Sequence, residues 1–166
     1  YKITDVSSKV FRRNPLAPFT TSTLQQTASG KYGFGASRTM QIAQRLYQGI
    51  DLEGDTIGLI TYMRTDGTNI SKEAITDFRN FINKEHGKEY LPEFPNNYSG
   101  KKAKNAQEAH EAIRPTDVNR KPSDLKKYLS TDQSKLYELI WNRAVSSQMN
   151  PAEFDRKSIT IESEDK

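Results

Sequence analysis

Hydrophobic and polar positions alternate at both ends of the chain and follow a helical period through much of the middle. Residues 1–6 and 158–163 alternate as a half-buried strand does, and neither has an obvious partner nearby in sequence. Ser22, with Gln25 three residues later, resembles a capping box and predicts a short helix near 21–29 that Gly30 ends. The two chain ends are thus expected to be strands around a helical body.

Three longer helices are predicted further along the chain. One is capped by Ser37, one runs from a cap at Ser71 to about Glu85, and the strongest opens at Thr131 and stops before Pro151. Apolar residues recur on one face of each at helical spacing. These are Met40, Ala43, Leu46, Tyr47 and Ile50 in the first, Ala74, Ile75, Phe78, Phe81 and Ile82 in the second, and Leu136, Leu139, Ile140, Ala144 and Val145 in the third.

The segments between these helices are short or irregular. Residues 56–62 are β-branched and apolar, which favours a strand. Residues 87–104 have no period and read as a loop, and one or two helical turns are expected from Asn105 and Glu108 to Pro115. The predicted fold class is therefore mainly α, a helix-turn-helix or winged-helix-like domain with a short strand or hairpin and terminal strands.

Composition excludes several kinds of chemistry. The 166 residues contain no cysteine, so disulfides, thiolate metal sites and cysteine nucleophiles are absent. Mean hydropathy is −0.84 and charged residues make up 28%. We expect no membrane-spanning segment, and a reducing cytoplasm is compatible with this composition.

Positive charge is concentrated in the first third of the chain. Residues 1–50 hold seven Lys and Arg against one Asp, which raises the prior for a nucleic-acid partner. Each basic side chain alone is more often solvated surface, and the nearby aromatic side chains that could stack on bases are more often core. The candidate phosphate contacts are Arg12, Arg13, Lys31, Arg38 and Arg45, and the candidate stacking residues are Tyr32, Phe34 and Tyr47.

Residues 58–66 (GLITYMRTD) carry the strongest chemical signal. In an extended chain Tyr62, Arg64 and Asp66 would project from one face, about 7 Å apart from one to the next. A phenol with a pKa near ~10 is a weak nucleophile, and a neighbouring guanidinium favours phenolate and binds phosphate. This pattern is compatible with phosphodiester chemistry. From the spacing alone, the commoner arrangement is a strand end where Tyr62 packs on a helix and Arg64 pairs with Asp66.

No metal site is predicted. Asp51, Glu53 and Asp55 resemble the start of a calcium loop, but Thr56 and Tyr62 stand where glycine and glutamate are required, so the segment reads as a turn. His110 has no second histidine at metal-ligand spacing. From the residues alone it would be a solvent-facing side chain.

Four collinear motifs resemble the type IA DNA topoisomerases. Besides residues 58–66, which resemble that family's active-site tyrosine motif, they are residues 18–26 (PFTTSTLQQ), 38–47 (RTMQIAQRLY) and 107–116 (QEAHEAIRPT). Met63 is similar to the bacterial branch of the family. Gly67 departs from the pattern, because the family usually has serine there, and a hydroxyl contact at that position is then missing.

The resemblance implies roles for individual residues. Tyr62 would attack a single-stranded DNA phosphodiester and become linked to the 5′-phosphate, and strand passage and religation would relax DNA without ATP. Arg64 would stabilise charge on the phosphate in the transition state. His110 and Arg114 would lie near the DNA backbone.

The resemblance also implies a domain organisation. Residues 1–17 and 156–166 would be strand stubs of a neighbouring arch domain, and residues 18–155 the catalytic-tyrosine domain. Mg²⁺ would be bound by another domain of the parent chain and not by this segment, which alone is expected to be a monomer inactive in cleavage. The expected partners are single-stranded DNA and the arch and metal-binding domains.

Two other function classes remain open. One is a non-enzymatic winged-helix-like DNA-binding module in which Tyr62 is structural. The other is a scaffold domain that docks on another protein, which fits the charge asymmetry and explains none of the motifs. A 5′-phosphotyrosyl adduct distinguishes the enzyme from both.

Overall fold

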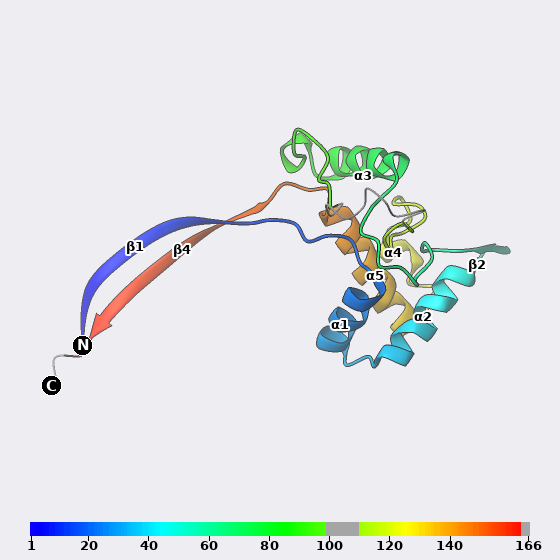
Figure 1. Cartoon of the computed structure of the whole chain (residues 1–166), viewed down its shortest axis with the longest axis horizontal. Helices are drawn as coiled ribbons and strands as arrows, with labels where there is room; N and C mark the ends of the chain where they lie inside the picture. Colours follow the sequence, from blue (N-terminus) through cyan, green and yellow to red (C-terminus); the bar gives the residue numbers. More distant parts are fainter. Residues whose placement is uncertain (99–109, 164–166) are drawn as a thin grey trace.

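The computed structural model describes residues 1–98 and 110–163 and consists of a helical body with a long two-stranded ribbon extending from it (Figure 1). The helices of these ranges are α1 (Thr21–Tyr32), α2 (Ala36–Gln48), α3 (Lys72–Glu85), the 3₁₀ helix η1 (Lys88–Tyr90), α4 (Pro122–Leu125) and α5 (Thr131–Ser146). The strands are β1 (Lys2–Arg13), β2 (Ile50–Leu52), β3 (Asp55–Ile57) and β4 (Ala152–Glu162). The prediction of helices with small antiparallel strand pairs is confirmed at this level.

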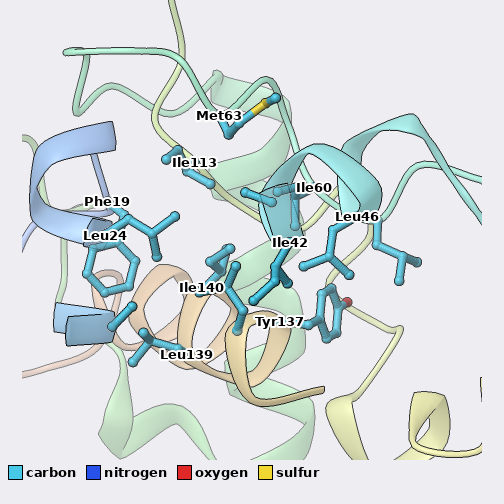
Figure 2. Packing of buried hydrophobic residues seen from close by; sticks show 14 of the residues in the cluster. Phe19, Leu24, Ile42, Leu46, Ile60, Met63, Ile113, Tyr137, Leu139 and Ile140 are labelled. Atoms are coloured by element: carbon cyan, nitrogen blue, oxygen red, sulfur yellow. The ribbon is translucent and has the colours of Figure 1, made fainter. Parts of the chain in front are cut away.

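Helix α5 is the centre of the body. Its residues from Leu136 to Ile140 pack against α1 and α2 in a cluster that includes Leu24 and Leu46 (Figure 2). Its second half packs Ala144 and Val145 against α3. The helix also holds the loop that contains residues 118–120. Tyr137 Oη donates to the Arg120 carbonyl (2.7 Å), and Trp141 Nε1 donates to the Val118 carbonyl (3.0 Å).

The starts of the helices correct two predictions. Thr20, and not Ser22, caps α1 in a capping box with Thr23, and α1 continues through Gly30 to end at Gly33, whose φ of 69° is left-handed. Helix α2 begins after Gly35 without a side-chain cap, so the cap at Ser37 was wrong.

The apolar face of α2 also differs in part from the prediction. Ala43 and Leu46 are buried as expected, and Met40 is partly buried, but Tyr47 is 41% exposed and Ile50 lies in β2 beyond the helix. Thr39 and Ile42 complete the buried face instead. The exposed position of Tyr47 is relevant to the site described below.

The predicted boundaries of α3 and α5 agree with the structure. Ser71 Oγ accepts from the Ala74 amide (3.3 Å) at the start of α3, which ends at Glu85. Helix α5 starts at Thr131, is capped by Ser130 and ends at Ser146, before Pro151. The one-turn helix α4 was not predicted.

The predicted strand over 56–62 is shorter in the structure. Strand β3 ends at Ile57, paired with β2 around a turn at Glu53, and the chain then continues without regular structure, with bends at Thr61 and Met63 and one bridge between Ile60 and Pro115. The described part of the predicted turns, residues 110–115, is not helical: it bridges Phe19 through Ile113. The rest of those turns, 105–109, and residues 99–104 of the predicted loop lie outside the described residues.

The two predicted end strands pair with each other. Strands β1 and β4 are antiparallel over their whole length, and every side chain in them is exposed. Thr4 is an extra residue in β1, and this bulge brings Ile3 opposite Ile161, on the same face as the Val6–Ile159 pair. Four exposed apolar side chains therefore gather on one face of the ribbon.

Among the described residues, no helix combines the length and the apolar character that crossing a bilayer would require.

Candidate active site

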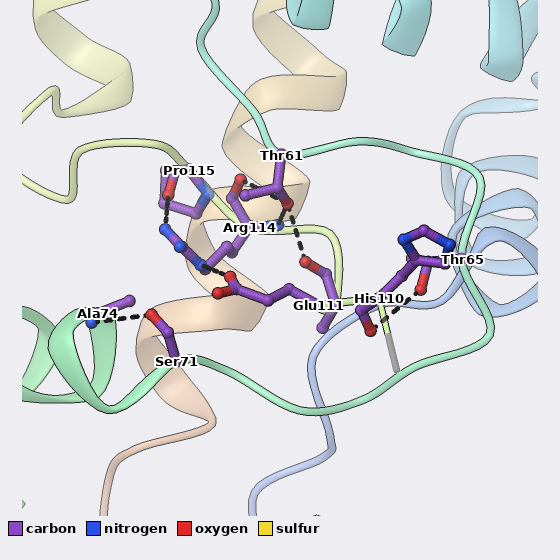
Figure 3. A network of polar contacts seen from close by, with 9 residues as sticks. Thr61, Thr65, Ser71, Ala74, His110, Glu111, Arg114 and Pro115 are labelled. Carbon is purple, nitrogen blue, oxygen red and sulfur yellow. Dashed lines mark hydrogen bonds and ion pairs between the residues drawn. The ribbon is translucent and has the colours of Figure 1, made fainter. Parts of the chain in front are cut away.

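The segment from Gly58 to Gly67 crosses the body between two other parts of the chain. On its first half, the Thr61 amide donates to the Arg114 carbonyl (2.9 Å) and the Thr116 amide to that of Leu59 (3.0 Å). The Thr61 hydroxyl donates to the Ala112 carbonyl (2.8 Å) and accepts from the Arg114 amide (3.0 Å), as Figure 3 shows in part. One hydroxyl thus joins the backbone before Tyr62 to the 112–114 segment.

A second threonine holds the backbone after Tyr62. Thr21 Oγ1 donates to the Met63 carbonyl (2.7 Å) and accepts from the Thr65 amide (2.9 Å). The Thr21 amide also donates to the Thr65 carbonyl (2.9 Å). Because Thr20 caps α1, the neighbouring Thr21 is free to make these bonds. In the sequence, the threonine-rich motif indicated a helix start and a family resemblance, and this role of Thr21 was missed.

Side-chain burial alternates along this segment as the extended spacing predicts. Tyr62, Arg64 and Asp66 are exposed, whereas Met63 and Thr65 between them are buried. No ion pair involves Arg64 or Asp66 within the described ranges, so the alternative in which the two residues pair is not what the structure shows. The guanidinium of Arg64 is available for an anion.

Tyr62 lies between two other rings. Its ring meets that of Tyr47 edge-on at 5.4 Å between centroids and is tilted to that of His110 at 6.5 Å. The side chain is 42% exposed, and its hydroxyl has no hydrogen bond to another described residue. The ring is therefore held from two sides while its oxygen remains accessible.

Gly67 brings His110 close to this segment. A Cβ at Gly67 would lie 2.0 Å from the His110 carbonyl oxygen, a distance that no side chain tolerates. The Thr65 hydroxyl also donates to that carbonyl, at 3.4 Å (Figure 3). Gly67, where the family usually has serine, therefore lies against the backbone of His110. This close approach places His110 beside Tyr62.

Arg114 is engaged within the protein. Its Nε donates to Glu111 (2.6 Å) and its Nη1 to the Pro115 carbonyl (3.1 Å), and its side chain is only 15% exposed (Figure 3). The structure gives this arginine a role in holding the 111–115 segment. A DNA contact by Arg114 stays a prediction.

The other predicted basic residues are distributed over three places. Arg12 pairs with Glu153 (2.7 Å) on the ribbon, which also carries Arg13. Lys31 lies over the ring of Tyr32 at the end of α1. Arg38 pairs with Asp132 (2.5 Å) and stacks on Phe34 near the start of α2.

Only Arg45 among these five basic residues is brought next to the tyrosine segment. It lines a groove on α2 together with Arg64. The structure therefore gathers Tyr62, Arg64, His110 and Arg45. Of the predicted stacking residues, Phe34 is buried in the core, Tyr32 packs against it, and Tyr47 is exposed at the site.

The acidic turn at residues 51–55 is the β2–β3 hairpin. Asp51 accepts from the Gly54 amide (2.8 Å), and Glu53 bonds Tyr128 and Lys127, which hold its pKa below the ordinary value. No cluster of three or more His, Asp or Glu side chains suited to a metal occurs among the residues described.

Comparison with known proteins shows the family of the chain. The family model described as DNA topoisomerase matches residues 1–166. DNA topoisomerase 1 of Rickettsia bellii is 51% identical over 166 residues, all of this chain and 21% of that protein, and that of Xylella fastidiosa (strain 9a5c) is 52% identical over 160 residues, 96% of this chain and 20% of that protein. Full-length topoisomerase I from Thermotoga maritima has a TM-score of 0.79 at 43% identity, covering 95% of this chain and 24% of that one. The chain spans about a fifth of the length of the relatives it matches, and it belongs to the DNA topoisomerase family.

Proposed function

We propose that this chain carries the strand-cleaving tyrosine of an ATP-independent type IA DNA topoisomerase. Tyr62 Oη attacks the phosphorus of a phosphodiester in a single DNA strand. The new Tyr62 Oη–phosphorus bond replaces the bond to the 3′-oxygen, which leaves as a hydroxyl after taking up a proton, while the phenol loses its own. Religation reverses these steps after strand passage, and the DNA is relaxed.

The observation that carries this proposal is the accessible Tyr62 beside Arg64, which forms no ion pair with a described residue, on a backbone held by hydrogen bonds. Thr61 and Thr21 bond the backbone on either side of Tyr62, so the backbone positions of Tyr62 and Arg64 keep a fixed relation to each other. A positioned cation stabilises charge that develops on a phosphate more effectively than a mobile one. His110, whose ring is 6.5 Å from that of Tyr62, is placed to contact the same DNA backbone.

Magnesium does not fit this part of the protein. The described residues offer no cluster of acidic side chains for a divalent cation, and the acidic turn at 51–55 is used in the hairpin. We assign the Mg²⁺ of the parent enzyme to another domain. The chain alone is then expected to bind single-stranded DNA weakly and not to cleave it.

The finer fold class is a winged-helix-like body. Helices α1, α2 and α5 share one core, and the β2–β3 hairpin follows α2 in the place of a wing. The proposed catalytic-tyrosine domain is residues 18–155.

The ribbon suits a neighbouring arch domain of the same chain. Among the described residues it is supported only by its own pairing, and Ile3, Val6, Ile159 and Ile161 offer an apolar face that a further sheet or helix would cover. We assign residues 1–17 and 156–166 to the arch, and we expect the segment to be a cytoplasmic monomer when separate from it.

Covalent capture of DNA tests the nucleophile. In the complete parent enzyme, denaturation during cleavage is expected to leave a protein–DNA adduct that retains the 3′-labelled part of the strand. Tyr62→Phe should abolish this adduct while single-strand binding is nearly unchanged, because only the phenol oxygen is lost. Tyr90→Phe, a matched change at another exposed tyrosine, should leave the adduct intact. An adduct that persists in Tyr62→Phe would refute the assignment.

Arg64→Lys tests the phosphate contact. It keeps the charge and loses the planar fork, so cleavage is expected to fall by a larger factor than DNA binding. An equal decrease in both would make Arg64 a binding residue without a role in the transition state.

A further inference from the structure

A polar groove runs along α2 from the candidate active site. Its lining, here called the α2 groove, consists of Ser37, Met40, Gln41, Gln44, Arg45 and Gln48 of α2 together with Arg64. Residues 37, 41, 44 and 48 recur at helical spacing and share one face, which extends about 16 Å along the helix. The opposite face of α2 packs into the core, so this face is the one open to a ligand.

The chemistry of the α2 groove suits a single strand of nucleic acid. Two arginines and no carboxylate line it, and neither arginine forms an ion pair with any described residue. Three glutamine amides add hydrogen-bond donors and acceptors of the kind that pair with base edges. Unpaired bases expose those edges, whereas a duplex buries them.

Two other grooves of the described ranges contain carboxylates, and the basic one on α3, with Lys72 and Arg79, includes no residue of the Tyr62 segment. The one between α3 and α5 is largely apolar, and its Lys121 is paired with Glu85 (2.6 Å). The one at the base of the ribbon contains Glu89 and Glu153, and the latter already pairs with Arg12. A polyanion would meet the carboxylate of Glu89 in the groove at the base of the ribbon, and it would meet no carboxylate in the α2 groove.

The α2 groove is continuous with the site of Tyr62. Arg64 belongs to both, and Tyr47, next to Gln48 on α2, contacts the ring of Tyr62 edge-on. A strand whose phosphate lies at Tyr62 and Arg64 therefore has the α2 groove as its next surface.

We propose that the α2 groove binds the nucleotides on one side of the phosphate attacked by Tyr62. Arg45 and Arg64 contact their phosphates, and the amides of Gln41, Gln44 and Gln48 contact base edges. This inference rests on the proposed function and adds to it a base-dependent contribution to affinity.

Fluorescence anisotropy at low salt tests the groove with the present chain. The probes are fluorescein-labelled 12-nucleotide oligothymidylate and the same strand with an abasic site moved through it one position at a time. Arg45→Ala should weaken binding several-fold and lower the slope of log affinity against log salt by about 0.7. Arg156→Ala on the ribbon is the matched control and should change neither.

The glutamines are tested by a double substitution. Gln44→Ala with Gln48→Ala should weaken binding of the intact strand by about fivefold, as expected for lost hydrogen bonds. The loss should disappear with the strand whose abasic site faces the groove. Gln26→Ala, an exposed amide on α1, is the control.

Some outcomes would overturn the proposal. One is unchanged affinity in both groove variants, and another is an equal loss for the intact and abasic strands. A third is an effect of the glutamines only on docking of the metal-binding part added in trans, which would make the groove a domain interface. Each can occur while Tyr62-dependent capture persists in the parent enzyme, so failure of this inference is distinguishable from failure of the proposed function.

Discussion

The helical body and the β1–β4 ribbon are stabilised in different ways. In the body, α5 is covered by α1, α2 and α3, and side chains such as Ile140 and Leu136 are fully buried. In the ribbon every residue is exposed, and only the pairing of the two strands and their cross-strand contacts, such as Val6 with Ile159, hold it together. A ribbon of two strands is marginally stable by itself in water.

Because of this difference, the geometry around Tyr62 depends on the body alone, whereas the position of the body in space depends on the ribbon. The hydrogen bonds that hold the Tyr62 segment among the described residues come from the body, through Thr21, Thr61, Leu46 and the 110–116 segment. Bending of the ribbon would therefore carry Tyr62 and Arg64 together without changing their relation. The comparison is best tested by matched changes in the two regions.

A core truncation should have the largest effect. Ile140→Ala removes a fully buried side chain and is expected to lower the free energy of unfolding by about 3 kcal/mol. Ile159→Ala, at a ribbon position that is 56% exposed, should change it by less than about 0.5 kcal/mol. Urea unfolding followed by circular dichroism measures both, and similar losses would mean that body and ribbon unfold as one unit.

Two glycines should respond with opposite signs. Gly67→Ala introduces a Cβ against the His110 carbonyl and should destabilise the body by about 2 kcal/mol. Gly30→Ala, inside α1 with open space around it, should stabilise by about 0.5–1 kcal/mol. Thermal unfolding compares the pair, and a neutral Gly67→Ala would show that the 110–116 segment moves without cost.

Loss of the Thr21 hydroxyl should loosen the segment after Tyr62. Thr21→Val leaves the Thr65 amide and the Met63 carbonyl without this partner, and we expect a cost of about 1.5 kcal/mol. Hydrogen exchange at the Thr65 amide should become faster, whereas Thr21→Ser should preserve its protection. Unchanged exchange in the valine variant would exclude Thr21 as a positioning residue.

High pH should weaken the body through Tyr137. Burial raises the pKa of this phenol well above its ordinary value, so the unfolded chain loses the proton first. The stabilisation is present below pH 10 and is lost as pH rises further, by about 1.4 kcal/mol at pH 11 for one such group. Tyr137→Phe should reduce the loss of stability between pH 9 and 11 relative to the unsubstituted chain, and identical pH profiles would contradict the role of its burial.

Periodic features were predictable from the sequence. The apolar spacing located α3 and α5, Ser71 was correctly predicted as the cap of α3, and alternation placed Tyr62, Arg64 and Asp66 on one exposed face. Local signals failed where several compatible residues compete. Thr20 was preferred over Ser22 as a cap, and Gly33 over Gly30 as a helix end, because contacts with distant segments decide between them.

Long-range contacts could not be predicted from local patterns. The pairing of β1 with β4 joins residues about 150 positions apart, and nothing near either strand indicates its partner. The two-way bonds of Thr21 and the close approach of Gly67 to His110 also depend on segments that meet only in the folded body. The pairing of Arg114 with Glu111 was within reach, since the two are three residues apart in the sequence.

The antiparallel pairing of β1 and β4 has a mechanical consequence. A force that pulls Lys2 and Glu162 apart acts across one strand pair at a time and would open the ribbon like a zipper, towards Arg13 and Ala152. Such unzipping needs little force, because each step breaks only the bonds of one pair. The ribbon would then extend as a tether while the body, and the geometry around Tyr62, carries no load until the last pair has opened.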